Sequence, residues 1–450
     1  MINKVFIQTY GCQMNEYDSS KIMDLLSHEF DAEPSSTAET ADILIMNTCS
    51  IREKAQEKVF SLLGQWKKLK LKNPNIRIAV GGCVASQEGD VIMKRAPYVD
   101  IVFGPQTLHK LPDHIRENKF NSKQIIDIQF YKNDKFNHLP APIDVKPTAF
   151  LSIMEGCNKF CSFCVVPYTR GEELSRPVQD ILDEALSLTS KGVREINLLG
   201  QNVNAYQSEL SSGKDVDFSF LLRLMSRIDE IDRIRFTTSH PIDFNLELIN
   251  AMIEVPKLGN YLHLPVQSGS NKILKDMKRG YTREYYLRII DRLRKGNPNI
   301  SISSDFIVGF PDETKADFQQ TLDLIDEVGF DQSFSFVYSP RPGTPASVLG
   351  DSISFEEKNE RLRILQEKIS LNAKKISQSM IGTKQKVLIE NASKRSSLEV
   401  TGRTLNNKWV NFSGPQSLIG NIVEVEVTSA LSNSLRGRLV DHSTEVMAIA

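Results

Sequence analysis

The chain of 450 residues is 40% hydrophobic and 25% charged, which is typical of a globular protein, and its length predicts two or three domains. No run of eighteen apolar residues occurs, which excludes a membrane-spanning helix, and the opening "MINKVFIQTYG" lacks the layout of a secretory signal. A cytoplasmic location is therefore expected, where the six cysteines should stay reduced. The net charge of −1 argues mildly against a nucleic-acid partner.

Short apolar segments alternate with amphipathic helical patterns through the first third of the chain. The predicted strands are residues 4–11, 41–48, 75–82 and 99–104. This alternation predicts a parallel, doubly wound sheet. Cys12, Cys49 and Cys83 each follow the carboxyl end of one strand, at the edge where open parallel sheets bind ligands. We therefore expect three thiols that are far apart in sequence to lie close in space.

A second alternating block runs from residue 146 to 345 and contains six strand candidates separated by helical patterns. Six units are fewer than a closed eight-unit barrel requires, so a partial, open barrel is expected. Polar residues again follow the strands, at the end where barrel enzymes build their sites. These residues are Asn202, His240, Gln267, Ser268 and Asp305.

The rest of the chain changes character twice. A long helix is predicted over residues 354–380, because its apolar residues recur at helical spacing. Short strands between turn residues then predict a small β-barrel, with Trp409 and Phe412 in its core. Stacking on a nucleic-acid base is the alternative for both residues. The expected fold is thus α/β, with a doubly wound domain at 1–120, a weakly patterned linker at 121–142, a partial (β/α)6 barrel at 143–378 and the β-barrel at 379–447.

Three cysteines lie within eight residues, in "CNKFCSFC": Cys157, Cys161 and Cys164. A structural zinc site requires four ligands, and the nearest histidine, His138, lies outside the cluster. Zinc with a distant fourth ligand and buried structural cysteines remain as alternatives. The favoured interpretation is a 4Fe-4S cluster held by three thiolates, which leaves one iron open to a small molecule.

This spacing, together with its place after the first strand of a barrel-like block, resembles the radical S-adenosylmethionine (SAM) superfamily. The resemblance implies that SAM binds the open iron through its amino and carboxylate groups. It also implies that electron transfer cleaves SAM to methionine and a 5′-deoxyadenosyl radical. The cofactor would supply this chemistry, while the protein positions and shields it.

Two strand-end loops resemble the SAM-contacting loops of that superfamily. Gly200, Gln201 and Asn202 lie in "LLGQNVNAY", and Gln267 and Ser268 lie in "HLPVQSGS". Amide and hydroxyl groups suit the ribose and amino acid portions of SAM, and ordinary loop capping is the alternative for each residue.

Two arginines near these motifs are further candidates. Arg170 in "TRGEE" and Arg279 in "MKRGYT" could bind the SAM carboxylate or an RNA phosphate through bidentate pairing. A solvated surface position is the alternative for both.

The whole chain resembles the methylthiotransferase family. In that family an N-terminal domain carries an auxiliary 4Fe-4S cluster on three cysteines, which here would be Cys12, Cys49 and Cys83. A small C-terminal RNA-binding barrel, the TRAM domain, completes the family's architecture. "TYGCQMNEYDS", "CSFCVVPYTRGEELSRP", "RFTTSHP" and "YSPRPGTPA" resemble the members that act on N(6)-isopentenyladenosine in tRNA.

The resemblance implies that the C2 hydrogen of this purine, immediately 3′ of the anticodon, is replaced by a methylthio group. That C–H bond is not acidic, so no ordinary general base could break it. The sequence does not identify which side chains are catalytic. One SAM would be the radical source and a second the methyl donor. The partners would be the tRNA anticodon stem-loop and an external electron donor, and the protein is expected to be a monomer without membrane contact.

The C-terminal segment fits an RNA contact modestly, with eight Lys and Arg against six Asp and Glu from residue 381 onward. The alternative for each basic residue is an ordinary solvated position. The candidate phosphate contacts are Lys394, Arg395, Arg403, Arg436 and Arg438.

Two other functions remain open. The same chemistry could act on threonylcarbamoyladenosine in tRNA or on an aspartate of a ribosomal protein, although relatives of those kinds typically begin nearer "FGCKVN" and "LGCPKN". An iron–sulfur RNA-binding protein that senses redox state without turnover is a candidate from another class. Such a sensor would need no SAM pocket and would form no 5′-deoxyadenosine.

Overall fold

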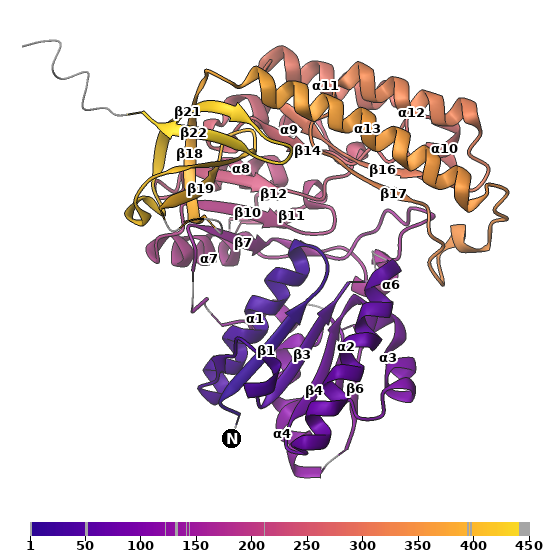
Figure 1. Ribbon diagram of the computed structural model, residues 1–450, viewed down its shortest axis with the longest axis vertical. Coiled ribbons are helices and arrows are strands. Elements are labelled where there is room, and N and C mark those ends of the chain that lie inside the picture. Colours follow the sequence, from indigo (N-terminus) through magenta and orange to yellow (C-terminus); the bar gives the residue numbers. More distant parts are fainter. Residues whose placement is uncertain are drawn as a thin grey trace, which may run out of the picture.

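The computed structural model describes residues 2–49, 53–121, 123–130, 134–140, 142–143, 145–210, 212–393, 396 and 398–440. Figure 1 shows three bodies: an N-terminal domain at the bottom, a central open barrel, and a small C-terminal barrel in yellow at the upper left. No helix within these ranges is both long and apolar enough to cross a membrane.

The N-terminal domain is a parallel sheet in the order β2-β1-β3-β4-β5-β6. Side chains alternate between its faces, so Ile43 and Ile45 pack with one helix layer while Leu44 and Met46 pack with the other. The doubly wound prediction is confirmed. The strands are β1 (Lys4–Thr9), β2 (Glu33–Pro34), β3 (Ile43–Thr48), β4 (Arg77–Gly82), β5 (Ile101–Phe103) and β6 (Ile125–Asp127). The helices are α1 (Gln13–Phe30), α2 (Glu53–Lys72), α3 (Cys83–Arg95) and α4 (Leu111–Asn121).

The interval predicted as a linker, residues 121–142, is more structured than its composition suggests. It contributes the edge strand β6, which pairs in parallel with β5, and the short helix α5 (Asp134–Asn137). A three-residue edge strand has too little sequence to show a periodic pattern, which is why the composition indicated a linker.

The central domain has all six predicted strand regions, and "ISISSDFIVGF" divides into two strands at Ser304. Its strands pair in three groups, β13-β10-β7, β14-β15 and β16-β17, which form an open barrel. The strands are β7 (Thr148–Ser152), β10 (Glu195–Leu199), β13 (Arg233–Phe236), β14 (Tyr261–His263), β15 (Ser301–Ser303), β16 (Asp305–Val308) and β17 (Phe334–Val337). The helices are α7 (Val178–Ser190), α8 (Phe218–Met225), α9 (Leu246–Glu254), α10 (Asn271–Asp276), α11 (Arg283–Gly296) and α12 (Lys315–Val328).

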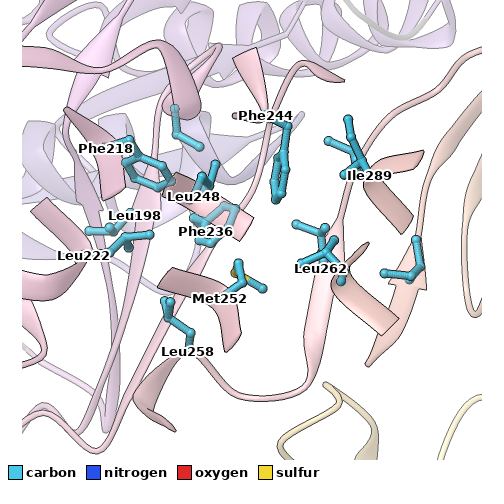
Figure 2. Close-up of a cluster of buried hydrophobic side chains, with 14 of the residues drawn as sticks. Leu198, Phe218, Leu222, Phe236, Phe244, Leu248, Met252, Leu258, Leu262 and Ile289 are labelled. Atoms are coloured by element: carbon cyan, nitrogen blue, oxygen red, sulfur yellow. The ribbon is translucent and has the colours of Figure 1, made fainter. Parts of the chain in front are cut away.

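The core of this domain lies between the strands and the surrounding helices (Figure 2). Phe218 of α8 meets Phe236 of β13 edge to face, with ring centroids 5.0 Å apart. Shorter elements lie in the connections between these strands and helices. They are β8 (Met154–Glu155), α6 (Val166–Arg170), β9 (Leu174–Ser175), β11 (Gln207–Glu209) and β12 (Asp215–Asp217).

The predicted long helix is α13 (Phe355–Ser379), which begins where the Ser354 side chain accepts a hydrogen bond from the Glu357 amide. The C-terminal barrel follows and closes in the order β18-β19-β20-β22-β21, as predicted. Its strands are β18 (Lys384–Ala392), β19 (Glu399–Arg403), β20 (Trp409–Ser413), β21 (Ile422–Ala430) and β22 (Leu435–Leu439).

The two aromatic residues of β20 do not share an environment. Phe412 is 1% exposed in the barrel core, as predicted, whereas Trp409 is 37% exposed. The prediction for Trp409 was wrong because successive side chains alternate across a strand, and residues three apart face opposite sides. Its ring instead lies beneath the Arg403 guanidinium, 4.9 Å from the ring centroid.

Candidate functional site

The structure brings the three N-terminal cysteines together at the carboxyl edge of the sheet. A Cβ on Gly11, next to Cys12, would lie 2.4 Å from the Cβ of Cys49. The pKa of Cys12 falls to about 6, mainly through its hydrogen bond with the Cys49 thiol. Burial raises the pKa of Cys83, and the nearby Cys12 charge adds to this rise. Cys12 is exposed, whereas Cys49 and Cys83 are buried.

Side-chain amides fix the loops that carry these thiols. Asn15 Nδ2 donates to Asn47 Oδ1 at 3.1 Å and to the Thr48 carbonyl at 3.2 Å, and Asn47 Nδ2 returns a bond to the Asn15 carbonyl at 2.9 Å. Gly82 has φ +93°, and a Cβ there would lie 2.3 Å from the Thr48 carbonyl oxygen. The turn into Cys83 therefore requires glycine.

Cys157, Cys161 and Cys164 form the second triad. They lie in the loop after β7 and β8 and line a cavity of about 270 Å³. Burial raises the pKa of Cys157 to about 11 and that of Cys164 to about 12. These two thiols are therefore protonated in the metal-free protein at neutral pH, and a metal centre would have to displace their protons. Three thiols facing one cavity are a donor set that suits an iron–sulfur cluster.

Two nitrogen donors are directed at the Cys161 sulfur. Arg279 Nη1 lies 3.3 Å from it, while Arg279 Nη2 donates to the Pro265 carbonyl at 2.8 Å. His240 Nδ1 accepts the Ile242 amide hydrogen at 3.3 Å, so the neutral ring carries its hydrogen on Nε2, 3.9 Å from the sulfur. Burial, with Arg279 and Lys159 nearby, lowers the pKa of His240 to about 2 and keeps the ring neutral. Arg279 is buried, so the surface alternative for this residue is wrong.

Most residues proposed to contact SAM surround the same cavity. Gln201, Asn202, Gln267 and Arg279 line it, whereas Gly200 and Ser268 do not. Ser268 instead lies within hydrogen-bond distance of Thr321, 3.3 Å between hydroxyl oxygens. His240 and Asp305, which the sequence placed at strand ends, also line the cavity.

Two buried polar atoms beside the cavity have no hydrogen-bond partner within the described part of the chain: Asn202 Oδ1 and Ser239 Oγ. The amide nitrogen of Asn202 is held by Asp243 at 2.8 Å, which fixes the orientation of the group. Unpaired buried polar atoms are rare in native proteins and indicate a missing partner. The cavity thus has the polar acceptors that a SAM molecule would satisfy.

Arg170 has none of the predicted surroundings. It is 3% exposed and pairs with Asp18 at 2.8 Å and Glu155 at 2.9 Å, so it is neither a surface residue nor available to a SAM carboxylate or an RNA phosphate. The sequence could not reveal this, because Asp18 lies 152 residues away along the chain.

Of the five candidate phosphate contacts in the C-terminal barrel, Lys394 and Arg395 lie outside the described residues. Arg403 is occupied by a bidentate pair with Glu390, at 2.7 and 3.0 Å, so a free phosphate contact there is wrong. Arg436 and Arg438 form partly exposed pairs with Glu399 and Glu426, both at 2.9 Å. Such surface pairs are weak and can exchange for a phosphate.

Within the described ranges, no three His, Cys, Asp or Glu side chains are grouped closely enough to hold one metal ion. A 4Fe-4S cluster attaches each thiolate to a different iron, so it suits thiols that are near each other without converging on one point.

Comparison with known sequences agrees with this geometry. Family models match "Uncharacterized protein family UPF0004" at residues 4–104, "Radical SAM superfamily" at 151–325 and "TRAM domain" at 378–440. A tRNA-2-methylthio-N(6)-dimethylallyladenosine synthase of Legionella pneumophila (strain Corby) is 58% identical over 441 residues, 98% of this chain and 99% of the relative. The chain belongs to the tRNA-2-methylthio-N(6)-dimethylallyladenosine synthase family. The synthase of Haemophilus influenzae (strain PittEE) is 56% identical, covering 99% of this chain and 94% of that relative.

Two solved structures share the fold of this family member at low identity. The radical S-adenosylmethionine methyltransferase TsrM from Kitasatospora setae has a TM-score of 0.57 at 13% identity, covering 77% of each chain. The cobalamin-dependent S-adenosylmethionine radical enzyme OxsB has a TM-score of 0.52 at 14% identity, covering 82% of this chain and 56% of that one. These likenesses support the architecture of a sheet domain joined to an open barrel.

Proposed function

We propose that this protein converts N(6)-isopentenyladenosine, 3′-adjacent to the tRNA anticodon, to its 2-methylthio derivative, with SAM as both radical source and methyl donor. One observation carries the proposal. Two separate thiol triads lie at neighbouring strand edges, and the second lines a cavity that also has unpaired amide and hydroxyl acceptors. The family's printed name describes this product.

We assign a 4Fe-4S cluster to each triad. Cys157, Cys161 and Cys164 would hold the cluster in the barrel, which when bound reduces SAM and supplies the carbon radical that the unreactive C–H bond requires. Cys12, Cys49 and Cys83 would hold the second cluster, whose open iron suits a sulfur ligand. The domains follow from these roles, with residues 1–120 carrying the auxiliary site, 143–378 the radical site and 379–447 the RNA contact.

The side chains around the cavity have distinct tasks. Gln201 accepts the Gly156 amide hydrogen at 2.6 Å and so orders the start of the loop that carries the second triad. Asn202 and Gln267 present amides to the cavity, and Arg279 with His240 donates toward Cys161. The cavity lies at the strand ends, where bound SAM and substrate would displace water from the reacting atoms, as a radical reaction requires.

The edge of the N-terminal sheet contacts the carboxyl edge of the barrel strands. Thr237, after β13, donates to Gln13 Oε1 at 3.1 Å, one residue from Cys12. This contact places the edge that carries Cys12 next to the strand ends of the barrel, as transfer from one site to the other requires. A base in a single-stranded loop can be extruded into such a pocket. We further propose a monomer in the cytoplasm, reduced by an external electron donor.

The test is anaerobic reconstitution with iron, sulfide, SAM and dithionite, followed by mass spectrometry of nucleosides from tRNA that carries isopentenyladenosine. The wild-type chain should form both 5′-deoxyadenosine and the methylthio nucleoside. Cys83→Ala should still form 5′-deoxyadenosine without methylthio product, and Cys161→Ala should form neither. Absence of methylthio product from the wild-type chain, or full product from Cys83→Ala, would contradict the proposal.

A further inference from the structure

Four buried charges meet where the N-terminal domain contacts the barrel. Asp18 lies on α1, Lys135 on α5, Glu155 on β8 and Arg170 at the end of α6, and none is more than 3% exposed. Each cation contacts both carboxylates. Lys135 lies 2.9 Å from Asp18 and 2.5 Å from Glu155, and Arg170 lies 2.8 Å from Asp18 and 2.9 Å from Glu155. We call these four residues the buried quartet.

The quartet is electrically balanced and is bonded to its surroundings. Gln106, after β5, donates to Glu155 Oε2 at 2.6 Å and to the Arg170 carbonyl at 3.1 Å. Removing four charges from water is unfavourable, and well-packed apolar residues often stabilise a fold as well as a buried ion pair does. A contribution to folding stability therefore does not explain why four charged residues are buried at this position.

One member of the quartet extends beyond it to the N-terminal triad. Helix α3, which begins at Cys83, contacts α6, which ends at Arg170, and the two helices lie side by side in Figure 1. Arg170 also pairs with Asp18 on α1, the helix that begins directly after Cys12, so it is tied to the helices that start at both Cys12 and Cys83. Its positive charge acts on the Cys83 thiol, where it opposes the rise in pKa that burial causes. Arg170 thus has two kinds of neighbour: the two carboxylates that hold it and the thiols of the N-terminal triad.

We propose that Arg170 is a positioning residue that supplies a fixed positive charge to the N-terminal cysteine triad, and that Asp18 and Glu155 hold its guanidinium there. This inference rests on the proposed function, which assigns a 4Fe-4S cluster to that triad. Three thiolates and a small sulfur anion at the open iron make such a site strongly anionic. A guanidinium cannot lose its proton, and burial protects its field from screening by salt.

The consequence is a change in reduction potential that a structural role would not produce. Reduction adds negative charge to the cluster, so a neighbouring cation raises the potential and a neighbouring carboxylate lowers it. Arg170→Gln should therefore shift the potential of the N-terminal cluster to a more negative value. Glu155→Gln should shift it to a more positive value, because Arg170 is then less neutralised.

The experiment uses the full-length chain with Cys157, Cys161 and Cys164 replaced by Ala, so that only the N-terminal cluster contributes to the signal. Each variant is added to this background, reconstituted anaerobically and titrated with dithionite while electron paramagnetic resonance is recorded. Arg233→Gln is the matched control. Arg233 is equally buried and pairs with Glu195 at 3.1 Å, but it starts β13 at the opposite end of the barrel strands.

Opposite shifts for Arg170→Gln and Glu155→Gln, with an unchanged control and equal iron content, would support the proposal. Unchanged potentials with the cluster intact would overturn it while leaving the proposed function in place. A background protein that binds no iron would overturn both. If Arg170→Gln fails to retain the cluster, the potential of Glu155→Gln is the deciding measurement. An unchanged or more negative potential in Glu155→Gln would contradict the proposal that Arg170 supplies positive charge to the cluster.

Discussion

Lys408 tests how the C-terminal barrel is attached to the rest of the molecule. The loop before β20 lies against the amino ends of the barrel strands, where Arg235 donates to the Thr404 carbonyl at 2.8 Å. Lys408 pairs with Asp331, and these side chains are 5% and 3% exposed. Lys408→Met leaves the Asp331 carboxylate buried without its cation. Removing one member of a buried pair costs about 3–5 kcal/mol, and we expect docking to weaken by that amount.

Amide hydrogen exchange of the full-length protein, read by mass spectrometry, measures this opening directly. Since each 1.4 kcal/mol is about tenfold, exchange at the docked loop, including the Asn260 amide that donates to the Leu405 carbonyl, should accelerate by roughly 10²- to 4 × 10³-fold. The double variant Lys408→Met with Asp331→Leu should return close to the wild-type rate, because replacing both charges by apolar groups is often neutral. Wild-type exchange in the single variant, or equal exchange in both variants, would refute the reasoning.

The same variants separate RNA binding from radical chemistry. Formation of 5′-deoxyadenosine without RNA should be unchanged in Lys408→Met, because Lys408 does not line the cavity that contains the second triad. Affinity for tRNA should fall, since an undocked C-terminal barrel no longer presents its surface at a fixed distance from that cavity. The double variant should recover this affinity.

Three further predictions concern single residues. Gly82→Ala should lower the iron content, measured by colorimetric assay, by about one 4Fe-4S cluster per chain, because its Cβ would clash with the Thr48 carbonyl oxygen. Gly192→Ala is the control and should retain full iron content, since Gly192 also has a positive φ, +95°, but a Cβ there would have no atom within 4 Å. In metal-free protein, iodoacetamide should alkylate Cys12 before the other cysteines. Its alkylation rate should rise with pH around a midpoint near 6, the lowered pKa of Cys12, because only the thiolate reacts and it is present above that pH. Faster labelling of Cys164, measured by peptide mapping, would contradict this. In denaturant unfolding, Phe412→Ala should destabilise the C-terminal barrel by about 3–5 kcal/mol, because it empties a core position. Trp409→Ala should cost about 1 kcal/mol or less. Equal losses of stability would contradict the burial of Phe412 and the exposure of Trp409.

The convergence of Cys12, Cys49 and Cys83 could be predicted because the geometry of a parallel sheet is regular. Carboxyl ends of neighbouring strands meet at one edge, so three residues at strand ends must approach one another wherever the sequence separates them. The open barrel followed from the same regularity, and so did the cavity that Asn202, Gln267 and Asp305 surround. Periodic patterns carry this information because they repeat along every element.

The buried charges could not be predicted, because each depends on a partner from a distant segment. Lys135 lies 117 residues from Asp18 along the chain, and its own segment was indistinguishable from a polar linker. Arg403 had the same difficulty, since a basic residue on a β-barrel indicates RNA only if no carboxylate occupies it. Local sequence shows which groups are charged, but the pairing of those charges is a property of the folded chain.

Nucleosides from total tRNA of a strain that lacks this gene provide the most direct test of the central claim. We predict loss of 2-methylthio-N(6)-isopentenyladenosine and accumulation of the unthiolated nucleoside, both measured by mass spectrometry, with recovery when the wild-type gene is restored. Persistence of that nucleoside, with loss of the methylthio group from threonylcarbamoyladenosine or with no change in any tRNA nucleoside, would contradict the account.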